Sequence, residues 1–228
     1  MASAREMVRR EHGDSRLAKV LVDRLEAGFG KGHDSYAWEG HAWTGNDIDK
    51  LWLTTEGEGE RRGALESAEV QLLWGHAINP WFDLRAGLRQ DFRPGPRRTH
   101  LALGVQGLAP YWIEVDASLF LSHKGDVTAR IEAEHDMRLT QQLILQPRVE
   151  AGFALQDVPA LGIGSGLSTI EASLRLRHEF RPQSGPAVIA PYIGLAHERA
   201  FGGTADYRRA AGERRAGWKA LVGLYTWF

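Results

Sequence analysis

Apolar and polar residues alternate along most of the chain, and clusters of Gly, Pro, Asn and Asp interrupt this alternation. Segment 111–122 is the clearest case: its apolar residues share one parity, and Glu114, Asp116 and Ser118 share the other. A period of two is typical of β-strands, so the pattern predicts about twelve strands, with about ten as the alternative count. The expected strands are 19–29, 36–44, 50–56, 65–74, 81–91, 99–108, 111–122, 127–134, 142–153, 169–180, 188–198 and 216–228.

Helix-forming residues do not change this prediction. In segment 127–134 the apolar positions still recur every second residue, whereas a helix would place them three or four apart. Segment 4–17 is the exception, because it is charged and has no clear period; it could be a short helix or a flexible arm. We therefore expect an N-terminal arm at 1–17 and one β domain at 18–228.

The last strand indicates the kind of β domain. Counting back from Phe228, every second residue is apolar or neutral. An alternating strand that stops on a C-terminal aromatic is typical of bacterial outer-membrane barrels, so we expect an all-β, transmembrane, antiparallel up-and-down β-barrel. In such a barrel this strand pairs with 19–29. Thr226 is unusual, since a larger apolar residue is common at that position.

The lengths of the connections give an independent indication. The connections after even-numbered strands are short, and the two longest, 156–168 and 199–215, follow odd-numbered strands. Outer-membrane barrels have short periplasmic turns and longer external loops. The sequence thus predicts two periplasmic termini, with 156–168 as a candidate lid at the external mouth.

Composition is compatible with this interpretation. The formal net charge of the 228 residues is -1, which gives no reason to expect a nucleic-acid partner. Cysteine is absent, and no apolar run approaches the roughly 20 residues of a transmembrane helix. The mean hydropathy of -0.34 would suit a soluble protein, but a membrane barrel also averages apolar and polar faces. No export signal is recognisable, so we expect the sequence to be a mature or truncated form.

The polar strand face predicts a lumen of mixed charge. One interpretation is a lattice of ion pairs that fills and stiffens the barrel, since buried charges are costly unless they are paired or hydrated. The other is a polar path for a small cation. The carboxylates that we expect along such a path are Glu26, Glu69, Glu114, Asp116 and Glu132.

Histidines are scattered and form neither HExxH nor HxH. Glu39 and His41 lie two apart on one strand, so both would face the lumen as a nitrogen and oxygen pair for a divalent transition metal. A histidine hydrogen-bonded within a polar lumen is the alternative. His33, His100 and His123 are external-loop candidates.

The sequence gives less support for a sulfur-rich metal site, a phosphate-binding loop or a catalytic site. The chain contains three Met and no Cys, so it is not a methionine-rich Cu(I) binder. Segment 162–166 is Gly-rich but lacks the Lys of a phosphate loop and the spacing of a nucleophile elbow. An enzyme would need a catalytic set at the barrel rim, such as Ser122 with His123 or His100 with Asp91. We therefore expect neither catalysis nor an organic cofactor.

Several segments, in order, resemble the copper resistance protein B family of bacterial outer-membrane proteins. One of them is WEGHAWTGND at 38–47. The others are 10–13, 51–53, 56–58, 68–71, 81–87, 91–94, 107–112, 162–168, 171, 191–194 and 201–204.

The resemblance implies an outer-membrane barrel that contributes to copper tolerance together with periplasmic copper-handling proteins. Family members often carry a Met/His-rich segment before the barrel, which this sequence lacks. His12, Glu39 and His41 lie in matched segments and are the candidate metal ligands. The leading hypothesis is a barrel in outer-membrane lipid that binds or passes copper ions. The alternatives are an enzyme with a rim active site and a structural barrel that anchors a copper-binding periplasmic segment.

Overall fold

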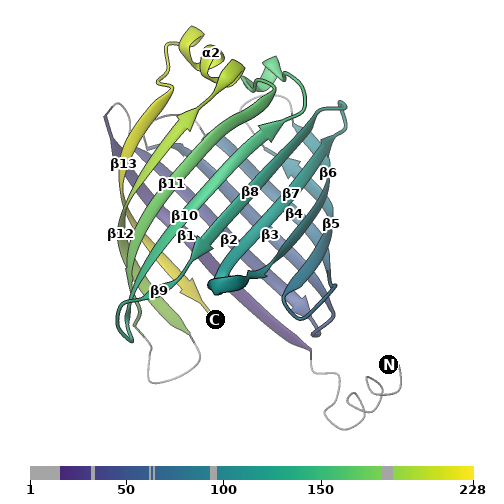
Figure 1. The fold of residues 1–228 in the computed structure, drawn as a ribbon, viewed down its shortest axis with the longest axis vertical. Coiled ribbons are helices and arrows are strands. Elements are labelled where there is room, and N and C mark those ends of the chain that lie inside the picture. The colour runs from purple at the N-terminus through teal and green to yellow at the C-terminus, as the bar shows by residue number, and fades with distance from the viewer. Residues whose placement is uncertain (1–15, 32–33, 62, 64, 93–96, 181–186) are drawn as a thin grey trace.

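A closed antiparallel barrel makes up almost all of the structure (Figure 1), a computed structural model that describes residues 16–31, 34–61, 63, 65–92, 97–180 and 187–228. Twelve strands form the wall, and the two-residue strand β9 pairs only with β10. The strands are β1 (Leu17–Gly30), β2 (Ser35–Gly45), β3 (Asp49–Glu60), β4 (Leu65–Ala77), β5 (Phe82–Asp91), β6 (Arg98–Ala109), β7 (Ile113–Ser122), β8 (Val127–His135), β9 (Met137–Arg138), β10 (Leu143–Ala154), β11 (Gly166–His178), β12 (Val188–Ala200) and β13 (Ala216–Trp227).

The first and last strands close the barrel. β1 pairs with β2 on one side and with β13 on the other, and β8 pairs with β10 where the chain passes through β9. Phe228 completes the closure, because its backbone N and O each lie 3.0 Å from the O and N of Val20. The predicted up-and-down barrel of twelve strands is confirmed, as is the pairing of the last strand with the first.

Several predicted strand boundaries are wrong; β4, for example, extends to Ala77, and β11 begins at Gly166 and ends at His178. Tyr111 and Trp112 belong to a short 3₁₀ turn, η1 (Pro110–Trp112), and not to the seventh strand. β3 continues to Glu60, because alternation persists through a run of Glu and Gly. Leu17 was assigned to the arm but is the first residue of β1. The rest of the predicted arm, at 1–15, lies outside the described residues.

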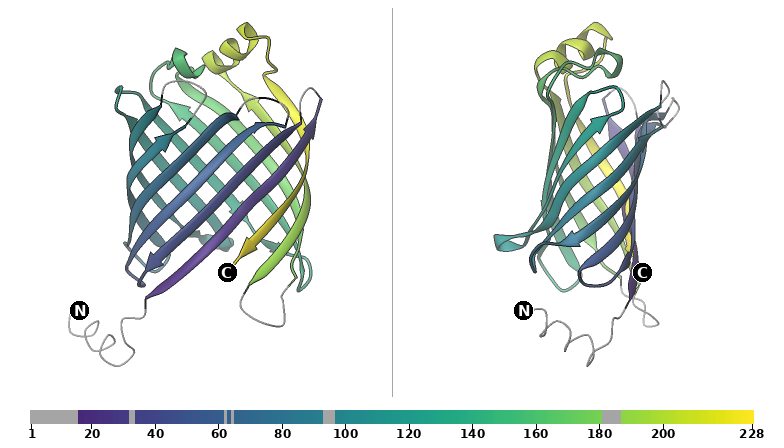
Figure 2. Two further views of the ribbon diagram at one scale, coloured as in Figure 1. Left: turned by 180° about the vertical axis from the view of Figure 1, so that it is seen from behind. Right: turned by 90° about the vertical axis from the view of Figure 1, so that its right-hand side faces the viewer.

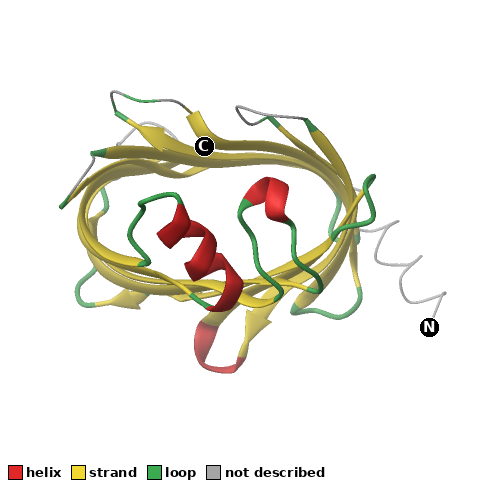
Figure 3. Ribbon diagram, turned by 90° about the horizontal axis from the view of Figure 1, so that it is seen from above, coloured by secondary structure: helices red, strands yellow, loops and turns green. Residues whose placement is uncertain are grey.

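The two rims differ in their connections. We call the rim where β1 begins and β13 ends the terminal rim, and the opposite one the distal rim (Figure 2). Short turns such as those after β2 and β4 lie at the terminal rim, and the two longest connections lie at the distal rim. These two carry η2 (Pro159–Leu161) and the helix α2 (Gly202–Ala210), which extend over the barrel mouth (Figure 3).

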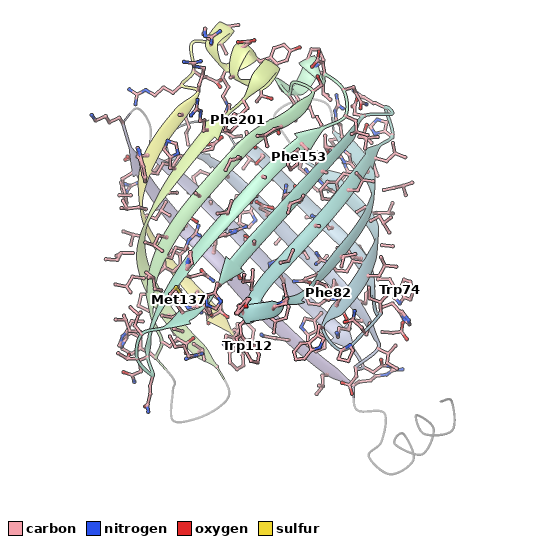
Figure 4. The ribbon with its side chains drawn as sticks, viewed as in Figure 1. Trp74, Phe82, Trp112, Met137, Phe153 and Phe201 are labelled. Atoms are coloured by element: carbon pink, nitrogen blue, oxygen red, sulfur yellow. The ribbon has the colours of Figure 1, made fainter. Side chains whose placement is uncertain are left out.

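The outer surface of the wall is apolar. Leu88, Leu101 and Ile193 are among many large apolar side chains that are exposed on it, and Trp74 projects outward from β4 (Figure 4). Among the described residues, no helix has the length and apolar character needed to cross a membrane. Leu88, Leu101 and Ile193 lie on β5, β6 and β12, on the parity that the alternation predicts to face outward.

The barrel is flattened. Seen from above it is an oval, and Figure 1 looks along its shortest axis with β8 and β10 in front of β2, β3 and β4. This brings two opposite walls close enough for long side chains to span the lumen.

Candidate functional site in the lumen

Two arginines connect the opposite walls. From β8, Arg130 places Nη1 2.5 Å from Glu56 Oε2 on β3 and Nη2 3.1 Å from Glu69 Oε2 on β4. From β10, Arg148 places Nη1 3.3 Å from Glu39 Oε2 on β2. Arg148 also forms an ion pair within its own wall, where its Nη2 lies 2.5 Å from Glu132 Oε2 on the neighbouring strand β8. These contacts cross the short dimension of the oval.

Neighbouring ion pairs extend this connection around the wall. Arg24 Nε lies 2.8 Å from Glu39 Oε2, and Arg24 Nη2 lies 3.3 Å from Glu56 Oε1. Arg89 joins Glu69 and Asp91, with both distances 2.7 Å. Each charge is thus placed against at least one opposite charge, which offsets the loss of hydration on burial. The predicted lattice of ion pairs is present.

An aromatic ring occupies the lumen beside this lattice. The guanidinium carbons of Arg89 and Arg130 lie 4.5 and 5.9 Å from the ring centroid of Phe120. Cations over an aromatic face are attracted by its quadrupole. Phe120 also packs with Leu73 and Ala102, so the lumen holds a small apolar cluster among its charges. Side chains therefore fill much of the barrel.

A cavity of about 60 Å³ remains at the centre. Carboxylates from β2, β3, β4, β7 and β8 face it, together with one histidine. This volume is enough to hold water. The lining residues are Glu39, His41, Thr54, Thr55, Glu56, Glu69, Gln71, Arg85, Asp116, Ser118, Phe120, Arg130 and Glu132.

The predicted pair of metal ligands lies at this cavity. His41 Nε2 is 3.2 Å from Glu39 Oε1, so the two side chains face the lumen side by side. Glu39 also contacts Arg24 and Arg148, which satisfies its carboxylate in the absence of a cation. Within the described part of the chain, no group of three or more His, Asp and Glu is arranged to hold a metal ion. The cavity offers suitable ligand types but not a preformed coordination shell. His12, the third candidate, lies outside the described residues.

The carboxylates that were predicted to line a cation path lie in three different parts of the barrel. Glu69, Asp116 and Glu132 line the cavity. Glu26 lies elsewhere, where it accepts hydrogen bonds of 3.0 Å from Arg175 and from the hydroxyl of Tyr192. Glu114 is exposed near the terminal end of β7.

One of the histidines predicted to lie in an external loop lies in a strand instead. His100 lies within β6 and is only 5% exposed; its ring packs edge-on against Phe120, and its Nδ1 is 3.9 Å from Asp91 Oδ2. The alternation explains this, since His100 has the lumen parity of β6. His123 does lie in the distal turn after β7. His33 lies outside the part of the chain that the structure describes.

Of the two catalytic sets considered from sequence, Ser122 and His123 each contact other groups at the distal rim, whereas His100 Nδ1 and Asp91 Oδ2 lie 3.9 Å apart. The hydroxyl of Ser122 lies 3.1 Å from Asp126 Oδ2 within the turn, where it also accepts the N–H groups of Lys124 and Asp126. Nδ1 of the neighbouring His123 lies near the backbone of Thr99 instead.

Sequence reasoning missed several polar residues of the lumen, and Glu56 and Tyr192 are two of them. Glu56 joins Arg24 and Arg130, and Tyr192 holds Glu26. Both could have been found, because Glu56 shares the parity of Thr54 in β3, and Tyr192 shares the parity of Ala190 in β12.

Solved structures with a similar fold are small porins. The barrel superposes on the NanC porin with a TM-score of 0.58 and 12% identity, covering 90% of this chain and 98% of that chain. The KdgM porin gives a TM-score of 0.51 and 9% identity, covering 91% and 97%. At such low identity these likenesses show the fold alone.

Sequence comparisons identify the family. The family described as "Copper resistance protein B precursor (CopB)" matches residues 16–228. Copper resistance protein B from Escherichia coli is 43% identical over 209 residues, which are 92% of this chain and 69% of that protein. A homolog of copper resistance protein B from Pseudomonas syringae pv. tomato is 45% identical over 217 residues, covering 95% of this chain and 72% of that one. With an outer-membrane barrel fold and this match over nearly its whole length, the chain belongs to the copper resistance protein B family.

Proposed function

We propose that this outer-membrane barrel binds cupric ions at its central cavity and passes them across the membrane. The observation that carries the proposal is the convergence of Glu39, His41, Glu69, Asp116 and Glu132 on one cavity in the middle of the lumen. Carboxylate and imidazole are ligands that suit Cu(II), and the chain has no cysteine. Membership of a copper resistance family supports copper as the cargo.

The ion pairs suggest how a cation would enter. A divalent ion near His41 and Glu39 would compete with Arg24 and Arg148 for the same carboxylate. We propose that the cation displaces these guanidinium groups and is held by the freed carboxylates until they close again. Each displaced arginine has another carboxylate within reach, Glu56 for Arg24 and Glu132 for Arg148.

The orientation follows from the connections. We propose that the terminal rim faces the periplasm and that the distal rim with α2 faces outward, because the two longest connections lie at the distal rim. On this assignment the terminal mouth exchanges copper with periplasmic copper-handling proteins. We propose no catalytic role.

Titration with copper sulfate tests the binding step. The barrel is refolded in detergent, and Cu(II) binding is followed by electron paramagnetic resonance, in which an imidazole ligand gives nitrogen hyperfine structure. We expect one bound ion with nitrogen coupling in the wild type. His41→Gln should remove that coupling and weaken binding roughly tenfold or more, as expected when one metal ligand is lost.

The matched control is His123→Gln, since His123 lies in a distal turn away from the cavity. It should bind Cu(II) as the wild type does. An unchanged spectrum in His41→Gln would contradict the proposed site, as would equal losses in both variants.

A structural barrel is the second candidate. The observation in its favour is the same lattice, because Arg130 and Arg148 connect the walls and leave a cavity of only about 60 Å³. In that case copper would be handled by a segment outside the barrel, and the titration would find no bound ion in this chain.

A further inference from the structure

A second cavity lies outside the lumen, at the terminal rim. It is a groove of about 320 Å³ between the turn that joins β4 to β5 and the turn that joins β6 to β7. Its volume lies within the roughly 300–1,000 Å³ of small-molecule sites. The groove is lined by Asn79, Trp81, Phe82, Leu108, Ala109, Pro110, Tyr111 and Trp112.

An unusual backbone presents two of these aromatic side chains. Tyr111 and Trp112 have φ angles of 66° and 62°, the left-handed region that residues other than Gly avoid. Burial of the side chains does not compensate for this backbone conformation, since Tyr111 is 86% exposed and Trp112 is 70% exposed. The turn is fixed from behind, where His135 Nδ1 lies 2.9 Å from the carbonyl oxygen of Trp112. Strained positions that persist without burial are found at binding sites, where the strain presents a side chain.

The hairpin that carries η1 bends away from the barrel axis. Figure 3 shows it outside the oval, and Figure 4 shows Trp112 beside Phe82 at the lower edge of the wall. Figure 2 shows the same projection from the side. The two aromatic residues therefore lie outside the mouth of the lumen and take no part in the path proposed for copper.

The chemistry of the groove selects an apolar ligand. Its lining, all within the described residues, contains no charged side chain. The side-chain oxygen of Asn79 already accepts the backbone N–H groups of Trp81 and Phe82, at 2.8 and 2.9 Å. Hydrogen bonding to a ligand is thus left to the indole N–H groups and the tyrosine hydroxyl at the edges.

The groove is also continuous with the lipid-facing wall. Ile78 and Trp81 beside it are exposed, and the exposed side chains of Leu88 and Leu103 extend the apolar surface along β5 and β6. Trp and Tyr favour the interface between hydrocarbon and headgroups. A lipid chain bound in the groove would therefore remain in contact with the bilayer.

We propose that this groove is a lipid-binding site, which holds an acyl chain of a phospholipid from the membrane leaflet at the terminal rim. Trp81, Leu108 and Trp112 contact the chain, and the edge of the Tyr111 and Trp112 rings lies at the headgroup level. The site is independent of copper binding, so either can fail without the other.

Lipid retention measured by native mass spectrometry tests the proposal. The barrel is inserted into vesicles of phosphatidylethanolamine and phosphatidylglycerol and then extracted in a mild detergent. We expect the wild type to retain a single phospholipid. Trp112→Ala should reduce the lipid-bound fraction roughly tenfold, the effect of losing about 1.4 kcal/mol of apolar contact. Trp112→Phe keeps a ring and should retain most of the lipid.

Trp218→Ala is the matched control, because Trp218 is an equally exposed tryptophan on β13 near the distal rim. It should retain lipid as the wild type does, and heat-dependent migration on gels checks that each variant is folded. A wild type that carries no phospholipid overturns the proposal. Equal retention by Trp112→Ala, or an equal loss in Trp218→Ala, overturns it as well.

Discussion

Arg130 on β8 and Glu56 on β3 form an ion pair across the barrel, with Nη1 2.5 Å from Oε2. The two residues are 74 positions apart in the chain, and their strands lie in opposite walls, β8 in front and β3 behind in Figure 1. The second nitrogen of the same guanidinium reaches Glu69. Arg130 therefore connects the two walls through two carboxylates and occupies part of the lumen between them.

Removing this side chain should open and weaken the barrel. Arg130→Ala removes one guanidinium partner from Glu56 and one from Glu69, and it removes a side chain that fills the lumen. The two carboxylates are left with Arg24 and Arg89. We expect a larger cation conductance in planar bilayers. The loss of stability should be about 1–3 kcal/mol, below the 3–5 kcal/mol of a fully buried pair because this one is partly hydrated. Reversible urea unfolding in vesicles measures the second effect.

Arg208→Ala is the control for this experiment, since Arg208 pairs with Glu198 near the distal rim and away from the central lattice. It should leave the unfolding free energy within about 0.5 kcal/mol of the wild type. If Arg130→Ala leaves both conductance and stability unchanged, the lattice does not close the lumen.

A glycine on β13 makes room for a lumen tyrosine. A Cβ at Gly223 would lie 2.4 Å from the ring of Tyr192, whose hydroxyl donates to Glu26. Gly223→Ala should push this ring away and cost about 1–3 kcal/mol by overpacking. On the same strand, a Cβ at Gly217 would meet nothing within 4 Å, so Gly217→Ala should be nearly neutral. Equal unfolding free energies for the two variants would show that Tyr192 is not held against β13.

The last residue closes the barrel through its backbone. Phe228 and Val20 exchange two hydrogen bonds of 3.0 Å. Deleting Phe228 should therefore reduce the yield and rate of folding into lipid vesicles, measured by heat-dependent gel migration. Phe228→Leu keeps both bonds and an apolar side chain, and it should fold much more like the wild type. If the deletion folds at the wild-type rate, closure does not depend on this pair.

A buried hydroxyl joins the two long connections at the distal rim. Thr204 at the start of α2 is buried, and its Oγ1 accepts the N–H of Gly164 from the other long connection at 2.9 Å. Thr204→Val keeps the shape but leaves that N–H unpaired, at a cost of about 1–3 kcal/mol. We expect faster tryptic cleavage at the arginines of α2 and of the segment that follows it. Thr204→Ser restores the acceptor and should restore resistance, and cleavage that is equal in all three proteins would contradict the role of this contact.

Most of the wall could be predicted because alternation fixes both the strand and the face of each residue. The seventh strand shows the limit, since Tyr111 continues the parity of Ile113 but lies in a turn with a left-handed backbone. Neither sequence period nor residue type indicates such a conformation for Tyr and Trp. Thr226 is explained only by the structure, in which its hydroxyl donates to the carbonyl oxygen of Val188 at 2.8 Å.

The sequence predicts which residues face the lumen, but it does not predict which of them contact one another there. Parity places Glu39, His41 and Glu132 inside the barrel, but it does not say which wall faces which. The contact of Arg148 with Glu39 depends on the flattening of the barrel, which brings β10 close to β2. Sequence alone gives no measure of that shape, so the cavity that gathers these side chains could not be foreseen.

Copper flux into sealed liposomes tests the central claim most directly. Wild-type barrel is inserted into liposomes that contain a Cu(II)-quenched dye, with insertion verified by heat-dependent migration, and external copper sulfate is added. We expect quenching well above that of empty liposomes, a clear reduction in His41→Gln, and none in His123→Gln. Quenching at the rate of empty liposomes, with the wild-type barrel folded and inserted, would contradict copper passage through this barrel.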